Sequence, residues 1–341
     1  MRRGRSLLSV PVLFALAASP QALGAATAPT FTVQIDWYPT IEHASLYQGQ
    51  ARGDFAKEGL NVEMPRWKLG MNVADEVAQG HVDIGIDDAV NFLKFVDQGA
   101  DLVAVYAYLQ ETPLCLVSLR HKLNRIEDLA GKKVATVKGY EYLVEYFRLK
   151  FPQLKDKVRF EVVDDNVAAL ERGDVDVGIF FETAQVPLFR LRGYHPNVLR
   201  YQDIGYDVYS HVVFVRRDFY EKNRGPLEGF LKALHRSMGE TFADPAQTAA
   251  LFTKTVPYTD YTEGPFKNNA DYTRYQEACL KMLHYYMTKG VGSNYGLMNR
   301  GRWQAMVRSL KALKVLKSDI DPDAVFTNEL LKGVYADGRR G

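Results

Sequence analysis

The sequence predicts a two-lobed α/β protein, and three observations support this prediction. Segments with the periodicity of strands alternate with segments of helical periodicity along most of the chain. One helix–strand unit occurs twice, at residues 73–88 and 167–182; in each copy a helix ends at a glycine, and a VDIGI or VDVGI strand with acidic residues at its C-terminal end follows. The length of 341 residues, 47% of them hydrophobic, is enough for two domains of about 150 residues.

The first lobe is predicted from the N-terminal half of this alternation. Its strands are runs of β-branched and aromatic residues, and glycine closes each of its helices. Strands separated by helices are typical of a largely parallel sheet. We expect strands at residues 31–36, 60–67, 82–86 and 102–108, and helices at residues 45–59, 72–80 and 89–99.

The second lobe repeats the same alternation. Residues 125–139 predict a short helix and then a strand that ends in glycine. A helix at 140–151 and a strand at 158–164 follow, and residues 166–180 contain the second copy of the helix–strand unit. This order predicts a second sheet of the same kind as the first.

Two segments are expected to connect the lobes and act as a hinge, one within residues 103–119 and one at residues 208–215. The C-terminal part is predicted to be helical and to pack around the first lobe, with helices at residues 225–244, 270–290 and 302–317. The predicted division assigns residues 29–117 and 212–341 to the first lobe and residues 118–211 to the second.

The N-terminal residues 1–24 have the pattern of a secretory signal peptide. Three arginines lie in the first five positions, an apolar run of 12 residues covers 7–18, and small residues follow. That run is too short to span a bilayer, which needs about 20 apolar residues. We therefore expect export to the periplasm. The two cysteines, Cys115 and Cys279, are expected to be buried thiols, with a disulfide as the alternative.

The charge balance and the histidine spacing exclude several classes of function. Lys and Arg number 43 and Asp and Glu 41, a formal net charge of +2, so no basic excess is present to bind nucleic acid. The seven histidines show no spacing of two, three or four residues, which argues against a metal site. No cofactor-binding motif is present, and a monomer is expected.

Residues 36–62, DWYPTIEHASLYQGQARGDFAKEGLNV, combine a W-x-P motif, a histidine and GxFxxEGL. With the two VD-[IV]-G-I units and the DLAGKKVATVKG segment, they resemble the family of thiamine-pyrimidine-precursor proteins. That family is similar to the type II periplasmic substrate-binding proteins of ABC importers and has an enzyme branch, the hydroxymethylpyrimidine synthases. The resemblance implies that two lobes close on a thiamine-type aminopyrimidine and deliver it to a membrane permease with its ATPase. Another ligand, such as riboflavin or an aromatic amine, is the alternative.

The chain departs from the synthase branch at the residues that the resemblance implies for catalysis. Those synthases carry a lysine that holds pyridoxal phosphate and a histidine four residues later, where this chain has Asp87 and Asn91. Their phosphate loop matches the segment around Gly139 and Tyr140, where a glycine is missing and Glu141 would repel a phosphate. We therefore predict a binding protein that is not an enzyme and has no cofactor, with a synthase as a further alternative.

Ligand-binding residues are expected where the strands end, because ligands of open α/β sheets bind beyond the carboxyl ends of the strands. Aromatic side chains there could stack on a flat ligand or only pack the lobe. Glu182 could accept paired hydrogen bonds from an aminopyrimidine, and the other acidic residues could bind ligand or cap helices. Such carboxylates favour a ligand that donates hydrogen bonds or is cationic. The predicted set is Asp36, Trp37, Tyr38, His43, Asp87, Asp88, Asn91, Gly139, Tyr140, Phe181, Glu182 and His211.

Overall fold

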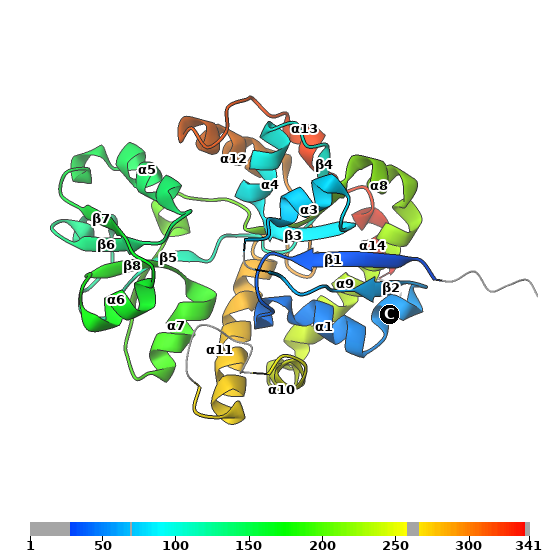
Figure 1. The fold of residues 1–341 in the computed structure, drawn as a ribbon, viewed down its shortest axis with the longest axis horizontal. Coiled ribbons are helices and arrows are strands. Elements are labelled where there is room, and N and C mark those ends of the chain that lie inside the picture. Colours follow the sequence, from blue (N-terminus) through cyan, green and yellow to red (C-terminus); the bar gives the residue numbers. More distant parts are fainter. Residues whose placement is uncertain (1–27, 69, 258–265, 338–341) are drawn as a thin grey trace, which may run out of the picture.

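The structure is a computed structural model that describes residues 28–68, 70–257 and 266–337. The predicted signal peptide, residues 1–24, lies outside the described residues. Two five-stranded sheets lie at opposite ends of the molecule, each with helices packed around it, and the predicted two-lobed α/β architecture is confirmed (Figure 1). Among the described residues, no helix is both long and apolar enough to cross a bilayer.

The sheet of the first lobe has the strand order β2-β1-β3-β10-β4. Strand β1 runs parallel to β2 and β3, whereas β10 runs antiparallel to both β3 and β4. The predicted parallel sheet is therefore correct for β1 to β3, and the antiparallel strand β10 comes from a distant part of the chain. The bounds are β1 (Thr30–Ile35), β2 (Asn61–Glu63), β3 (Ile84–Asp88), β4 (Leu102–Ala107) and β10 (His211–Arg216).

Eleven helices of the described chain surround this first sheet or extend from it. They are η1 (Ile41–His43), α1 (Ala44–Ala51), α2 (Asp54–Lys57), α3 (Val73–Gln79), α4 (Ala89–Asp97), α8 (Arg217–Lys222), α9 (Arg224–Ala243), α10 (Pro245–Thr255), α12 (Arg300–Ala312), α13 (Pro322–Val325) and α14 (Leu331–Asp337).

The sheet of the second lobe has the order β7-β6-β8-β5-β9, which repeats the pairing of the first. Strand β6 runs parallel to β7 and β8, and β5 is antiparallel to β8 and β9. The elements are β5 (Leu114–Ser118), η2 (Ile126–Leu129), β6 (Lys133–Thr136), α5 (Glu141–Lys150), η3 (Pro152–Leu154), β7 (Arg159–Val162), α6 (Asn166–Arg172), β8 (Val177–Phe181), α7 (Glu182–Leu191), β9 (Asn197–Arg200) and η4 (Gln202–Ile204).

The repeated helix–strand unit has the same geometry in both lobes. Helix α3 ends at Gly80 and leads to β3, and α6 ends at Gly173 and leads to β8. Both glycines have positive φ angles, 78° and 85°, a left-handed conformation that a side chain disfavours. The glycines recognised in the sequence thus turn the chain from each helix into a central strand.

Two short segments join the lobes, residues 108–113 after β4 and residues 205–210 before β10. The predicted boundary after residue 117 lies at the end of β5, whereas the chain has already left the first sheet after Ala107. The reason is that β5 forms its ladder with β8 and β9 of the second lobe. Cys115 in β5 and Cys279 are both buried and are not joined by a disulfide, as expected.

The sequence predicted that the C-terminal helices pack around the first lobe only. Helix α11 (Asn269–Thr288) differs from this prediction. It runs between the two lobes, packing against α10 and η1 on one side and α7 on the other (Figure 1). The Tyr275 hydroxyl donates to the carbonyl oxygen of Ala184 at 3.3 Å, and the carbonyl oxygen of Tyr286 accepts from the backbone N–H of Gln110 at 2.7 Å. These bonds tie α11 to the second lobe and to the first connecting segment.

Candidate functional site

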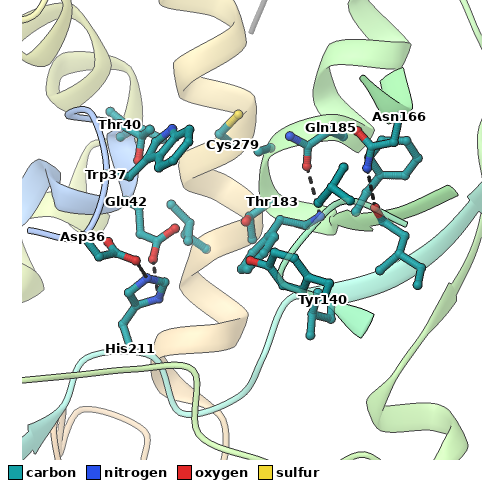
Figure 2. Close-up of a pocket in the computed structure, with 18 of the residues that line it drawn as sticks. Asp36, Trp37, Thr40, Glu42, Tyr140, Asn166, Thr183, Gln185, His211 and Cys279 are labelled. Carbon is teal, nitrogen blue, oxygen red and sulfur yellow. Dashed lines mark hydrogen bonds and ion pairs between the residues drawn. The ribbon is translucent and has the colours of Figure 1, made fainter. Parts of the chain in front are cut away.

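A cleft of about 530 Å³ lies between the lobes and has three walls (Figure 2). The first lobe contributes the segment that follows β1 together with His211, and the second lobe contributes the ends of β6 and β8 and the start of α7. The third wall is helix α11. This volume lies in the range of small-molecule sites, about 300–1,000 Å³. The cleft is therefore large enough for a ring compound.

Asp36, Glu42 and His211 form a charged cluster on the first-lobe wall (Figure 2). The Nε2 atom of His211 lies 2.9 Å from Oδ2 of Asp36, and its Nδ1 atom lies 2.9 Å from Oε1 of Glu42. Burial would lower the pKa of His211, but Glu42 and Asp36 raise it well above its usual value of 6.5. His211 is therefore cationic at neutral pH, and two carboxylates against one cation leave the cluster negative.

Asp87, Asp88 and Asn91 do not line the cleft, in contrast to the prediction. Asp88 caps α4, with its Oδ1 accepting from the N–H of Val90 at 2.8 Å, which is the alternative that the sequence left open. Asp87 accepts from the N–H of Asp88 at 2.7 Å and from Nδ2 of Asn91 at 2.5 Å. Their polar groups are therefore engaged in hydrogen bonds within the protein.

Burial perturbs both of these aspartates. Desolvation and the charge of Asp36 raise the pKa of Asp87 from 3.8 to about 8. Desolvation also raises the pKa of Asp88 to about 6, although His211 opposes the rise. Asp87 is consequently mostly protonated at neutral pH, and the negative charge beside the cleft resides on its neighbours.

Aromatic side chains line the cleft from both lobes. Trp37 is 42% exposed, and its ring centroid lies 4.7 Å from that of Trp67. On the second lobe Tyr140 and Phe181 meet edge to face, with centroids 6.5 Å apart, and Figure 2 shows Trp37 and Tyr140 on opposite sides of α11. Tyr38 does not line the cleft, and its ring centroid lies 5.2 Å from that of Trp67. It therefore packs within the lobe, which is the alternative that the sequence left open. The arrangement suits a flat ligand held between rings.

Glu182, predicted to bind ligand, has a different role in the structure and does not line the cleft. Its side chain is buried and accepts hydrogen bonds from Nε and Nη2 of Arg200, at 2.5 and 2.8 Å, and from the Tyr286 hydroxyl. Arg200 lies on β9, so nothing in the sequence near Glu182 revealed this partner. The carboxylate joins α7 and β9 of the second lobe to α11.

Glu182→Ala is accordingly expected to lower stability rather than to remove a ligand contact. Loss of a buried hydrogen-bond partner costs about 1–3 kcal/mol, and the 43% exposure of Arg200 keeps the expected value in that range. Chemical denaturation measures the change. Glu145→Ala, which breaks an exposed pair with Arg148, is the matched control and should cost about 0–1 kcal/mol. Equal losses in the two variants would contradict this role.

Of two other predicted residues, Gly139 lies outside the cleft lining and His43 lies in it. Gly139 is not part of the lining, and its N–H donates to Oε2 of Glu141 at 2.8 Å. The chain's own carboxylate thus occupies the donor that a phosphate would need. His43 lines the cleft, and burial lowers its pKa, so its imidazole is neutral.

Several lining residues were not predicted. Glu42 lies inside the recognised motif but carries no signal beyond its charge. Asn166 and Gln185 shape the second-lobe wall, where Nδ2 of Asn166 donates to Ile179 and Oε1 of Gln185 accepts from Phe181. The wall from α11 could not be expected, because its residues lie more than two hundred positions from the first motif. Its lining residues are Tyr275, Gln276, Cys279 and Leu283.

Within the described ranges, no group of three or more His, Cys, Asp or Glu side chains is arranged to hold a metal ion. The charged cluster around His211 is instead held together by its own ion pairs.

Comparison with known proteins identifies a family and a fold. A family model described as "NMT1/THI5 like" matches residues 40–248. The 4-amino-5-hydroxymethyl-2-methylpyrimidine phosphate synthase of Schizosaccharomyces pombe is 22% identical over 313 residues, covering 86% of this chain and 84% of that protein. The riboflavin-binding protein RibY of Chloroflexus aurantiacus is 22% identical over 345 residues, covering 95% and 93%.

Solved structures support the fold. The periplasmic aliphatic sulphonate binding protein SsuA of Escherichia coli matches with a TM-score of 0.65 at 17% identity, covering 89% of this chain and 99% of that chain. The periplasmic nitrate-binding protein NrtA of Synechocystis PCC 6803 matches with a TM-score of 0.60 at 12% identity, covering 90% and 88%. The predicted periplasmic-binding-protein fold is therefore confirmed.

The relatives contradict the prediction that this protein is not an enzyme. Proteins similar to it from Schizosaccharomyces pombe and Aspergillus parasiticus are named pyrimidine phosphate synthases. The prediction was based on Asp87 and Glu141. These residues argue only against the catalytic lysine and the phosphate loop that the resemblance implies for the synthases. Two positions cannot exclude every catalytic role of a cleft that also contains a histidine between two carboxylates.

Proposed function

The chain belongs to the NMT1/THI5-like family, and from this premise we propose that its cleft binds a small aromatic heterocycle with hydrogen-bond donors, such as an aminopyrimidine. The observation that carries this proposal is the pairing of aromatic walls on opposite lobes, Trp37 against Tyr140 and Phe181, next to a negative cluster. Aromatic walls favour a flat ring, and carboxylates favour amino groups or a cation.

Charge distinguishes this ligand class from an anionic cargo. Asp36 and Glu42 outnumber His211, so a sulfonate or nitrate in the same place would bring a third negative charge into a partly buried site. Burying a charge without a partner is costly. The proposal therefore favours an aminopyrimidine, and a flavin is the second candidate because the cleft is larger than one pyrimidine ring needs.

We further propose a transport role for this binding. The fold is shared with ligand-binding components of ABC import systems, which implies export to the periplasm and a permease with its ATPase as partners. The two connecting segments at residues 108–113 and 205–210 would serve as the hinge on which the lobes close. Such a carrier would act as a monomer.

Thermal unfolding in the presence of single compounds tests the proposal. The panel contains 4-amino-5-hydroxymethyl-2-methylpyrimidine, riboflavin, an aromatic amine and an alkanesulfonate. A ligand at 100 times its dissociation constant adds about 2.7 kcal/mol of stability. We expect a shift with the aminopyrimidine and none with the sulfonate. A shift with the sulfonate alone would overturn the proposal, and recovery of a chemically altered ligand would reveal catalysis in the same cleft.

Trp37→Ala is expected to weaken binding of the shifting compound by about tenfold or more, because the mutation removes both stacking and buried apolar area. Titration calorimetry measures the affinity. The side chain is 42% exposed, so the fold should tolerate the change. Tyr285→Ala removes an equally exposed aromatic side chain outside the cleft lining and should leave the affinity unchanged. Unchanged binding in Trp37→Ala would remove this residue from the site.

A further inference from the structure

Helix α11 presents an amide without a partner to the cleft. Gln276 lines the cleft and is only 1% exposed, and its Nε2 atom has no hydrogen-bond partner among the described residues. Buried polar groups in folded proteins nearly always find partners, so an exception at a cleft wall requires an explanation. A ligand that carries an acceptor would supply the missing partner.

His43, a second residue of the lining, lies on η1, which packs against α11. His43 is 2% exposed, and its Nδ1 atom accepts from the N–H of Thr40 at 3.5 Å. In the neutral tautomer that accepts this bond at Nδ1, the proton is on Nε2. Within the described part of the chain that Nε2 atom has no hydrogen-bond partner, and Oδ1 of Asp36 lies 3.9 Å from it.

The lining of one cleft therefore contains both donors and acceptors. The donors are Nε2 of Gln276 and Nε2 of His43, and the acceptors are the carboxylates of Asp36 and Glu42. A ligand that satisfies both kinds of group needs an acceptor and a donor on one edge. A ring nitrogen next to an exocyclic amino group has this arrangement, whereas an aromatic amine without ring nitrogens offers only the donor.

Helix α11 is held in place by contacts far from Gln276. The Tyr286 hydroxyl donates to Glu182, and Nζ of Lys289 lies 2.7 Å from Oε1 of Glu111 in the first connecting segment. The amide therefore occupies a defined position relative to the hinge. A fixed donor can discriminate between ligands, because it incurs no further cost of ordering when it binds.

We propose that Gln276, which lines the same cleft as His43, is the specificity-determining residue that recognises a ring acceptor of the ligand. The inference rests on the proposed function and narrows it to heterocycles in which a ring nitrogen adjoins an amino group. A site built to hydrogen-bond a polar group rejects an analogue that lacks it, because its own buried group is then left unpaired.

The test compares 4-aminopyrimidine with aniline, which has the same shape and amino group but no ring acceptor. We expect the wild-type protein to bind 4-aminopyrimidine at least tenfold more tightly. Gln276→Leu should weaken 4-aminopyrimidine binding at least tenfold and leave aniline binding within twofold. The melting temperature of the free variant should equal or exceed that of the wild type, because the mutation removes an unpaired amide.

The control variant is Gln48→Leu, which removes another buried glutamine amide of the first lobe outside the cleft lining. It should leave the ratio of the two affinities unchanged. If Gln276→Leu does not fold, Gln276→Met, which keeps the length of the side chain, replaces it. Retention of the wild-type ratio in the Gln276 variant would overturn this inference alone, whereas a wild-type protein that binds neither compound would overturn the proposed function together with it.

Discussion

His211→Leu is expected to destabilise the folded protein by about 3–5 kcal/mol, because it leaves two carboxylates in a partly buried site without their shared cation. Asp36 and Glu42 are only 22% and 15% exposed, and each lies 2.9 Å from a ring nitrogen of His211. Urea denaturation measures the loss, which is read from the midpoints when the m value is the same for both proteins. The same variant should also lose the positive charge that offsets these carboxylates in the cleft.

The pH dependence of this loss has a defined sign. The pKa of His211 is raised on folding, so its stabilising effect is complete below about 6.5 and disappears as the pH rises through the folded value. The difference between wild type and His211→Leu should therefore be larger at pH 6 than at strongly alkaline pH. His43→Leu is the matched control; His43 is equally buried but neutral, and its loss should cost only about 1 kcal/mol. Equal losses in both variants would contradict a stabilising role for the charge of His211.

Asp87→Asn is expected to make the protein more stable than the wild type at pH 9, with a much smaller difference at pH 5. Burial and the charge of Asp36 raise the pKa of Asp87 from 3.8 to about 8, so the folded state holds a proton that the unfolded state releases. The wild type therefore loses stability as the pH rises from about 4 to about 8. The full difference corresponds to on the order of 5 kcal/mol.

Asparagine has nearly the same shape as the protonated carboxyl group and does not ionise. The amide of Asn91 can rotate to match it, as its other contact is with the amide of Asn72 at 3.3 Å. The measurement is the free energy of unfolding of both proteins between pH 5 and 9. Asp36 and Asp88 interact electrostatically with Asp87, so the difference between the two proteins includes the change in their titration as well. Parallel pH curves for wild type and variant would contradict a raised pKa of Asp87.

Much of the fold could be predicted because it depends on local patterns. The alternation of strand and helix periodicity located both sheets, and the glycines at 80 and 173 located the turns before β3 and β8. These features depend on residues only a few positions apart. The lobe boundary was placed too late, because the partners of β5 are strands β8 and β9, which no local pattern identifies.

The candidate site was predictable only as far as strand ends determine it. Asp36, Trp37 and His43 follow β1 in sequence, and all three line the cleft. Asp88 and Glu182 occupy the same kind of position but are already engaged, one as a helix cap and the other with Arg200.

The sequence by itself determined the two α/β lobes, the repeated unit and the family. Only the tertiary structure decided which of the charged residues line the cleft and that α11 forms the third wall with Gln276. The physical reason is that periodicity follows from each residue's near neighbours, whereas the state of a buried polar group depends on which partner the fold brings to it. That partner can lie anywhere in the chain, as Arg200 does for Glu182 and as a ligand would for Gln276.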